Sequence, residues 1–167
     1  STVQYGDATA VETVNTDFGS TDLQMIAEKM VDDMLASGAV AQISAGGKRP
    51  ILFVDRIKNK TTEHIDTESI TDTISTKLLN SGKFRFVDMT AVDAVMKQMD
   101  YQKNSGLVDE AKSVQMGRQL GAQYMLYGNF SSIVKTAGNT KDVYYKFTLK
   151  LFDVQEGTIE WQDEKEI

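Results

Sequence analysis

Residues 50–87 read PILFVDRIKNKTTEHIDTESITDTISTKLLNSGKFRFV and predict a strand, a helix and a second strand in that order. The apolar run Ile51–Val54 follows the single proline of the chain, as expected for a short central strand. Phe84–Val87 repeats this apolar character after Gly82. Consecutive strands joined by a helix are normally parallel, with a right-handed connection. The stretch therefore predicts a parallel strand–helix–strand unit.

The helix of this unit is predicted from a cap, an apolar stripe and a stop signal. Asp66 or Thr67 can accept a hydrogen bond from a free amide of the first turn. The run Asn80-Ser81-Gly82 supplies the stop, because glycine readily adopts the left-handed conformation that ends a helix. Between them, apolar residues recur at helical spacing and predict the buried stripe: Ile70, Ile74 and Leu78, with Leu79 as a further candidate.

Three further helices and three further strands are predicted on either side of this unit. One helix begins at Thr21, where Gln24 completes a capping-box pattern, and ends at Gly38. The other two helices begin at Thr90 and near Asp109. The period of the apolar residues then changes from helical spacing to strict alternation, which predicts strands. These strands are Tyr124–Val134, Val143–Val154 and Thr158–Glu164, the last two joined by a tight hairpin.

Together these elements predict an α/β fold in a single domain over residues 20–167. The expected architecture is a layered sandwich with about four helices and a mixed β-sheet that ends in a C-terminal antiparallel meander. Residues 1–19 carry few large apolar groups and show no sustained periodicity, so we expect a loosely ordered N-terminal arm. A chain of 167 residues can bury a sufficient core without a metal or a disulfide.

Composition excludes several classes of function. The chain has 18 Lys+Arg against 24 Asp+Glu, a net charge of −6, which argues against nucleic-acid binding because that requires neutralisation of phosphates. The same charge argues against attraction to an anionic membrane surface. Cysteine is absent, which removes thiolate nucleophiles, zinc–sulfur sites and disulfides.

Candidate catalytic and metal-binding residues are few. His64 is the only histidine, and it stands in a polar loop before a helix cap, which is typical of a surface residue. The glycines of residues 45–49 precede a strand instead of following one, so they do not fit a phosphate-binding loop. We predict no catalytic residues, no cofactor and no metal site. A hydrolase that uses carboxylates alone stays open, since a sequence cannot pair acidic residues across space.

The last three strands contain a candidate partner-binding face. One alternation of the middle strand is apolar, and the other is Tyr144, Lys146, Thr148 and Lys150. The preceding strand places Met125, Tyr127, Asn129 and Ser131 on one face. If these sets align, they build an open sheet face with tyrosines among charges, and tyrosine is enriched in protein interfaces. The alternative is an ordinary solvated face, or a face covered by a helix with lysines reaching out to solvent.

Five short runs occur in an order and spacing that together cover about residues 20–167. They are Ile51–Asp55, Asn59–Thr61, Asn80–Phe84, Gly121–Tyr127 and Gly157–Trp161. Each run is short, but the set resembles the LpoB family of outer-membrane lipoproteins, which activate a bifunctional penicillin-binding protein. The resemblance implies a fold like that of the TolB N-terminal domain.

The resemblance also implies a function without catalysis by the chain itself. The family partner is a bifunctional, class A penicillin-binding protein, whose glycosyltransferase and transpeptidase activities are stimulated on binding. The expected location is the periplasmic side of the outer membrane, through a lipidated N-terminal cysteine that this chain lacks. The long proline-rich linker of the best-known members has no counterpart here, which implies a trimmed linker or a shorter arm.

We therefore predict a contact surface centred on Tyr127. It includes Asn129, Tyr144 and Lys146 on the sheet, with Lys112 and Arg118 on the adjoining fourth helix. The alternative function is an envelope scaffold or a secretion-assembly subunit of the TolB or curli-secretion type. Self-association into rings without synthase binding would favour that alternative.

Overall fold

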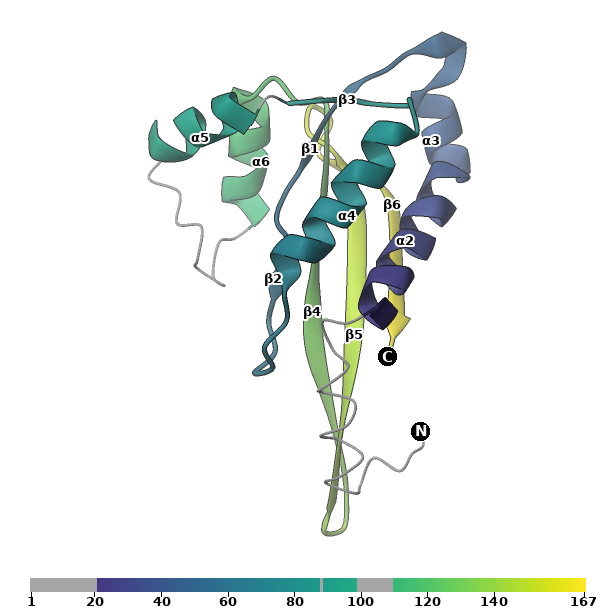
Figure 1. The fold of residues 1–167 in the computed structure, drawn as a ribbon, viewed down its shortest axis with the longest axis vertical. Helices are drawn as coiled ribbons and strands as arrows, with labels where there is room; N and C mark the ends of the chain where they lie inside the picture. The colour runs from purple at the N-terminus through teal and green to yellow at the C-terminus, as the bar shows by residue number, and fades with distance from the viewer. Residues whose placement is uncertain (1–20, 88, 99–109) are drawn as a thin grey trace.

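The computed structural model describes residues 21–87, 89–98 and 110–167. The predicted N-terminal arm, residues 1–19, lies outside these described residues. Figure 1 shows a single sheet with helices packed against it. The elements are α2 (Thr21–Leu35), α3 (Gly38–Ile43), the 3-10 turn η1 (Ala45–Gly47), β1 (Ile51–Val54), β2 (Lys58–Asn59), α4 (Thr67–Asn80), β3 (Arg85–Phe86), α5 (Met89–Gln98), α6 (Glu110–Gln119), β4 (Tyr124–Ala137), β5 (Thr140–Asp153) and β6 (Thr158–Glu166).

The sheet is mixed, with strand order β3-β1-β4-β5-β6 and with β2 paired to β4 beyond the end of β1. The strand β1 is parallel to both β3 and β4, while β4, β5 and β6 form an antiparallel meander. The parallel strand–helix–strand unit and the C-terminal meander predicted from the sequence are both confirmed. The mixed α/β fold class is confirmed with them.

One core lies between the sheet and the helices α2 and α4, which lie side by side on the same face (Figure 1). Strict alternation brings the apolar residues of β5 onto this face, as the sequence predicts. Phe130 and Phe147 stack across β4 and β5 with ring centroids 4.5 Å apart. Each large side chain buried here contributes roughly 1.5–3 kcal/mol. The core includes Leu23, Ala27, Val31, Met34, Ile70, Ile74, Leu78, Leu126, Leu149 and Leu151.

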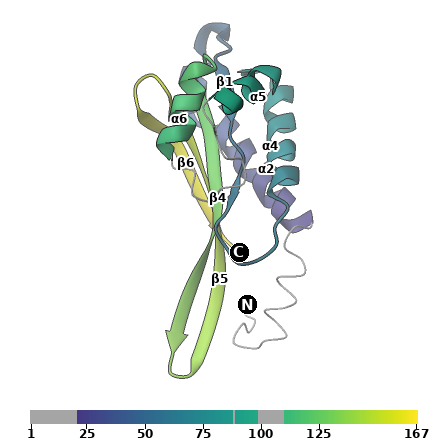
Figure 2. The same cartoon turned by 90° about the vertical axis from the view of Figure 1, so that its left-hand side faces the viewer.

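A second core lies on the opposite face, towards one end of the sheet, where α6 packs (Figure 2). Met116 of α6 and Val92 of α5 are buried there with Phe53, Met125 and Tyr127 of the sheet. Helices therefore cover both faces of the sheet at this end. This confirms the layered arrangement expected from the sequence.

The helix α4 follows its sequence signals closely. The carboxylate of Asp66 accepts a hydrogen bond from the Ser69 amide at 3.0 Å, which caps the first turn. The stripe Ile70, Ile74 and Leu78 is buried as predicted, but Leu79 is 53% exposed. The prediction for Leu79 was wrong because one further residue turns the side chain about 100° away from the sheet.

Two features around α2 go beyond what the sequence predicts. The side-chain amide of Gln24 reaches across to α4, donating to Ser69 Oγ and accepting from Thr73 Oγ1. A short helix, α3, also follows α2 and makes five α-helices among the described residues, where about four were expected. Ser37 caps it by accepting a hydrogen bond from the Val40 amide.

The hairpin of β4 and β5 is longer than predicted. Pairing continues without interruption to Ala137 and Thr140, across the polar residues expected to form a loop. Gly138, with φ of 61°, and Asn139 make the tight turn, a conformation that glycine adopts without steric cost. The two strands therefore project beyond the rest of the sheet as a narrow ribbon (Figures 1 and 2).

Candidate functional site

The polar alternations of the meander align as the sequence suggested. Across β4 and β5, Tyr127 pairs with Lys150, Asn129 with Thr148, and Ser131 with Lys146. Across β5 and β6, Thr148 pairs with Glu164 and Lys150 with Gln162. Because paired residues point to the same side of a sheet, these side chains share one face. It is the face that α6 covers at one end.

Tyr127 is not exposed at the centre of this face. Its side chain is only 7% exposed and belongs to the second core. The Phe152 ring meets it edge to face at 6.4 Å, and the Lys150 ammonium lies 5.9 Å from its ring centroid. The expectation of an exposed Tyr127 is therefore corrected: α5 and α6 cover this part of the sheet, and a lysine reaches over the ring, as in the alternative interpretation.

The remainder of this face is the strongest candidate site. We call it the open sheet face and define it by Asn129, Ser131, Tyr144, Lys146, Gln162, Glu164 and Glu166, which are half-buried or exposed. Lys146 forms an ion pair with Glu164 at 3.1 Å. The Lys135 ammonium lies 4.7 Å from the ring centroid of Tyr144. The structure thus brings Asn129, Tyr144 and Lys146 together on one surface, among both signs of charge.

Lys112 and Arg118 are both exposed on α6. They are six positions apart, so their side chains leave the helix in directions about 120° apart and do not form one stripe. The Arg118 guanidinium donates to the carbonyl oxygen of Val154 at 3.4 Å, at the end of β5. These two cations therefore flank the covered end of the sheet without forming one patch.

A buried polar cluster joins α6 to the sheet, and sequence reasoning missed it. Asp55, directly after β1, accepts from Ser113 Oγ at 2.8 Å and pairs with Lys58 Nζ at 3.3 Å. Its other oxygen accepts the Arg56 amide at 2.9 Å. Ser113 is 1% exposed, so its hydroxyl is closed to a substrate. The cluster fixes the position of α6 over the sheet. In the sequence, its only signal was that the charged residue Asp55 directly follows the apolar run Ile51–Val54.

The loop between β2 and α4 is ordered by its own side chains. Asn59 donates to the carbonyl oxygen of Glu63 and accepts from the amide and hydroxyl of Thr61. The Tyr145 hydroxyl then donates to Glu63 at 3.2 Å, which anchors the loop to β5. Burial of Tyr145, together with the negative charge of Glu63, raises the pKa of Tyr145 to about 12. His64 lies exposed in this loop, as predicted for a surface residue.

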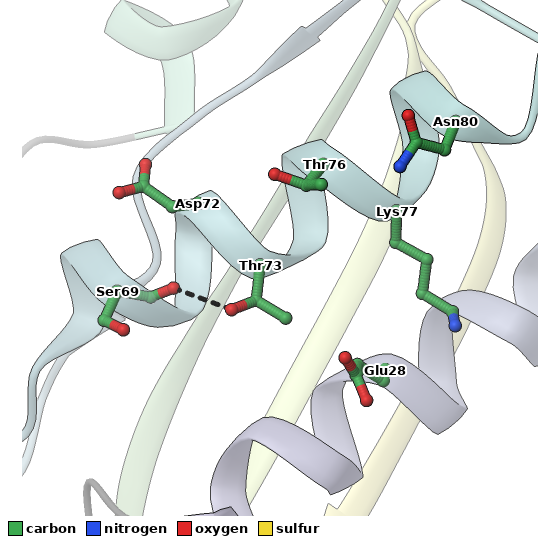
Figure 3. A pocket seen from close by; sticks show the side chains of 7 residues that line it. All are labelled: Glu28, Ser69, Asp72, Thr73, Thr76, Lys77 and Asn80. Carbon is green, nitrogen blue, oxygen red and sulfur yellow. Dashed lines mark hydrogen bonds between the residues drawn. The ribbon is translucent and has the colours of Figure 1, made fainter.

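A polar groove of about 460 Å³ lies between α2 and α4, on the side away from α6. Figure 3 shows its lining side chains, which are Glu28, Ser69, Asp72, Thr73, Thr76, Lys77 and Asn80. Lys77 forms an ion pair with Asp32 at 3.1 Å. All seven lining residues are polar, whereas small-molecule sites are mostly apolar. We interpret the groove as solvated space between two packed helices.

The described residues were also compared with the requirements of a metal site and of a membrane-spanning helix. Within the described ranges, three or more His, Asp or Glu side chains are nowhere grouped so that they could hold a metal ion. No described helix is both long and apolar enough to cross a membrane.

Comparison with known proteins identifies the family. The sequence model described as peptidoglycan-synthase activator LpoB matches residues 22–167, and the chain therefore belongs to the LpoB family. The chain is 30% identical to the penicillin-binding protein activator LpoB of Citrobacter koseri over 134 residues, which is 80% of this chain and 56% of that protein. It is 29% identical to the protein of the same name from Escherichia coli K12, with the same coverage. The chain thus spans a little over half the length of these relatives.

Solved structures agree with the family assignment. The LpoB C-terminal domain from Salmonella enterica aligns with a TM-score of 0.60 and 25% identity, covering 84% of this chain and 93% of that domain. The corresponding domain from Escherichia coli aligns with a TM-score of 0.61 at 24% identity and supports the fold. The fold described above is therefore that of the LpoB C-terminal domain.

Proposed function

We propose that this chain binds a bifunctional, class A penicillin-binding protein and stimulates its glycosyltransferase and transpeptidase activities. The observation that carries the proposal is the family match over residues 22–167, together with relatives named penicillin-binding protein activators. In this proposal the chain activates by contact and has no enzymatic activity of its own.

The open sheet face is the proposed contact surface. Asn129, Tyr144 and Lys146 present an amide, an aromatic ring and a cation on one face, and tyrosine is enriched in protein interfaces. Lys112 and Arg118 of α6 are proposed as separate contacts at the covered end of the sheet. Tyr127 supports the surface from beneath, since it lies under the Lys150 ammonium.

The proposed location is the periplasmic side of the outer membrane, with the full-length protein held there by a lipid anchor. The family assignment supports this location. In this proposal the full-length protein reaches inward from that membrane to the synthase that it activates.

Glycan polymerisation tests the function directly. The ectodomain of the class A synthase from the same organism is incubated with lipid-linked substrate, with and without the chain. We expect a several-fold faster polymerisation and saturable binding. A protein of unrelated fold and similar net charge serves as the control. Unchanged polymerisation together with no detectable binding would refute the activator proposal.

A further inference from the structure

The ribbon of residues 132–137 and 140–145 leaves the body of the sheet without a neighbouring strand among the described residues. On one side, β2 ends at Asn59, which pairs with Phe130. On the other side, β6 ends at Glu166, which pairs with Lys146, and Ile167 adds one bond to Tyr145. The six residue pairs beyond these points extend the ribbon by about 20 Å at roughly 3.3 Å per residue.

The backbone groups of one ribbon edge can be assigned from the bonds next to it. The carbonyl oxygens of Leu126 and Phe130 accept from Asp55 and Lys60, so the even-numbered residues of β4 point towards the β2 side. Because backbone groups alternate along a strand, Ser132, Val134 and Thr136 point the same way. Their amides and carbonyls continue the line that β2 occupies. This edge therefore presents three successive donor–acceptor pairs to an extended chain.

Side chains near this edge indicate what kind of chain fits. The ribbon carries three charged side chains: Lys135 of β4, which lies beside Tyr144 and opposite Asp142 of β5, and Lys141 of β5, which lies opposite Thr136. Val134 is 51% exposed between them. A strand added at this edge would lie beside Lys135 of β4, whereas Lys141 and Asp142 lie one strand further away on β5. An acidic residue next to Lys135 is therefore favoured. A second copy of the chain is disfavoured for two reasons. It would bring the same lysines together, and both chains carry a net charge of −6.

We propose that the β4 edge of the ribbon binds an extended, acidic segment of the partner protein by adding it as a strand in line with β2. This deepens the proposed function, on which it rests, by giving the synthase a second contact beyond the open sheet face. Main-chain hydrogen bonds supply the binding energy, and Lys135 selects the sign of charge. A lone two-stranded ribbon is only marginally stable, so a third strand would also order it.

A shortened hairpin tests the need for the ribbon. Residues 134–143 are replaced by Asn-Gly, a two-residue turn that joins Ile133 to Tyr144. Like Ala137 and Thr140 in the native turn, these two residues are paired across the strands, so the alternation of the hydrogen bonds is kept. Circular dichroism and thermal unfolding check that the body still folds. We expect binding to the synthase ectodomain to weaken at least tenfold. Undiminished binding by the folded variant would overturn the inference and leave the proposed function intact.

A pair of substitutions separates the backbone edge from the side chain. Val134→Pro removes the outward amide, whereas Val134→Thr keeps it with a side chain of similar shape. We expect at least tenfold weaker binding for the proline variant and less than a twofold change for the threonine variant. Equal loss in both would overturn strand addition, because it would place the contact in the side chain. Wild-type chain that neither binds nor activates would refute both proposals.

Amide exchange identifies the occupant of the edge. In the free chain the amides of Ser132, Val134 and Thr136 should exchange rapidly, and addition of the synthase ectodomain should slow all three. Ile133 and Lys135, which face β5, serve as internal controls and should change less. Slow exchange of the three amides before addition would overturn the proposal. If that slow exchange depends on the concentration of the chain, the occupant of the edge is a second copy. If it is lost when residues 1–20 are removed, the occupant is an internal segment.

Discussion

The strands β4 and β5 pass through two different environments along their length. At one end Phe130, Phe147 and Leu149 are fully buried under α2 and α4, and Met125 is buried under α6 on the opposite face. At the other end the same two strands form a ribbon with no described neighbour. The ends of β2 and β6 set the boundary. One hairpin can therefore build the core and also carry surface for a partner, with the two roles separated along its length.

The largest effect should come from removing the buried carboxylate that supports the embedded end. Asp55→Ala leaves Lys58, whose side chain is only 16% exposed, without its partner and frees the Ser113 hydroxyl. We expect a loss of about 3 kcal/mol in unfolding free energy, at the lower end for a broken buried ion pair. Urea unfolding gives this value. The control is Asp33→Asn, whose ion pair with Lys29 is exposed and should contribute less than about 0.5 kcal/mol. Equal effects would contradict this account of the cluster.

Gly128→Ala tests how tightly the embedded end is packed. A methyl group there would overlap the carbonyl oxygen of Thr148 and approach Leu149 Cδ2 to 2.8 Å. We expect a loss of about 2–3 kcal/mol, since overpacking strains both strands. Gly117→Ala is the matched control, because its methyl group would meet Val154 at an ordinary 3.5 Å. That variant should be neutral or slightly more stable, and thermal unfolding of the two distinguishes them.

Tyr145 stands at the boundary between the two environments and should make stability depend on pH. In the folded chain the hydroxyl of Tyr145 has a pKa of about 12, whereas in the unfolded chain it has its ordinary pKa of 10.0. The unfolded state therefore loses its proton first, and this part of the stability falls as pH rises from about 10 to about 12. Tyr145→Phe should cost about 1 kcal/mol at pH 7 and lose this alkaline component. Parallel pH curves for the two proteins would contradict the burial of the hydroxyl.

The smallest global effect should come from the ribbon. Gly138→Ala forces a residue with a side chain into the left-handed conformation of the turn, at a local cost of about 1–2 kcal/mol. Because the ribbon makes few contacts with the core, we expect global stability to change by less than about 0.5 kcal/mol. Amide exchange within the ribbon should become faster at the same time. A loss of global stability as large as that of Gly128→Ala would show that the two ends are not independent.

The sequence predicted best the elements whose signals are local. Residues 51–87 carry cap, stripe and stop in the right order, and the structure confirms the parallel unit they build. The alternation of β4 and β5 also predicted which side chains share a face. Both successes depend on the periods of 3.6 residues for a helix and 2 residues for a strand. These periods can be read along the sequence without information on which segments are in contact.

The failures depend on contacts between distant segments. Tyr127 has the alternation of an exposed face, and only the placement of α5 and α6 buries it. The hydrogen bonds of the Gln24 amide to Ser69 and Thr73 depend on the closeness of α2 and α4, which no local pattern displays. The ribbon was missed because Lys135–Asp142 has the composition of a loop. Its two strands are instead held by register and by a turn of two residues.

The most direct test of the central claim compares two surfaces of the same folded chain. Tyr144→Ala/Lys146→Ala changes the open sheet face, and Asp72→Ala/Thr76→Ala changes the polar groove between α2 and α4. Binding isotherms with the synthase ectodomain are measured for both, after circular dichroism confirms folding. We predict that the first variant binds at least about tenfold more weakly, as for loss of an interface centre, and that the second binds within about twofold of wild type. Undiminished binding by the open-face variant, or equal loss in both, would contradict the account.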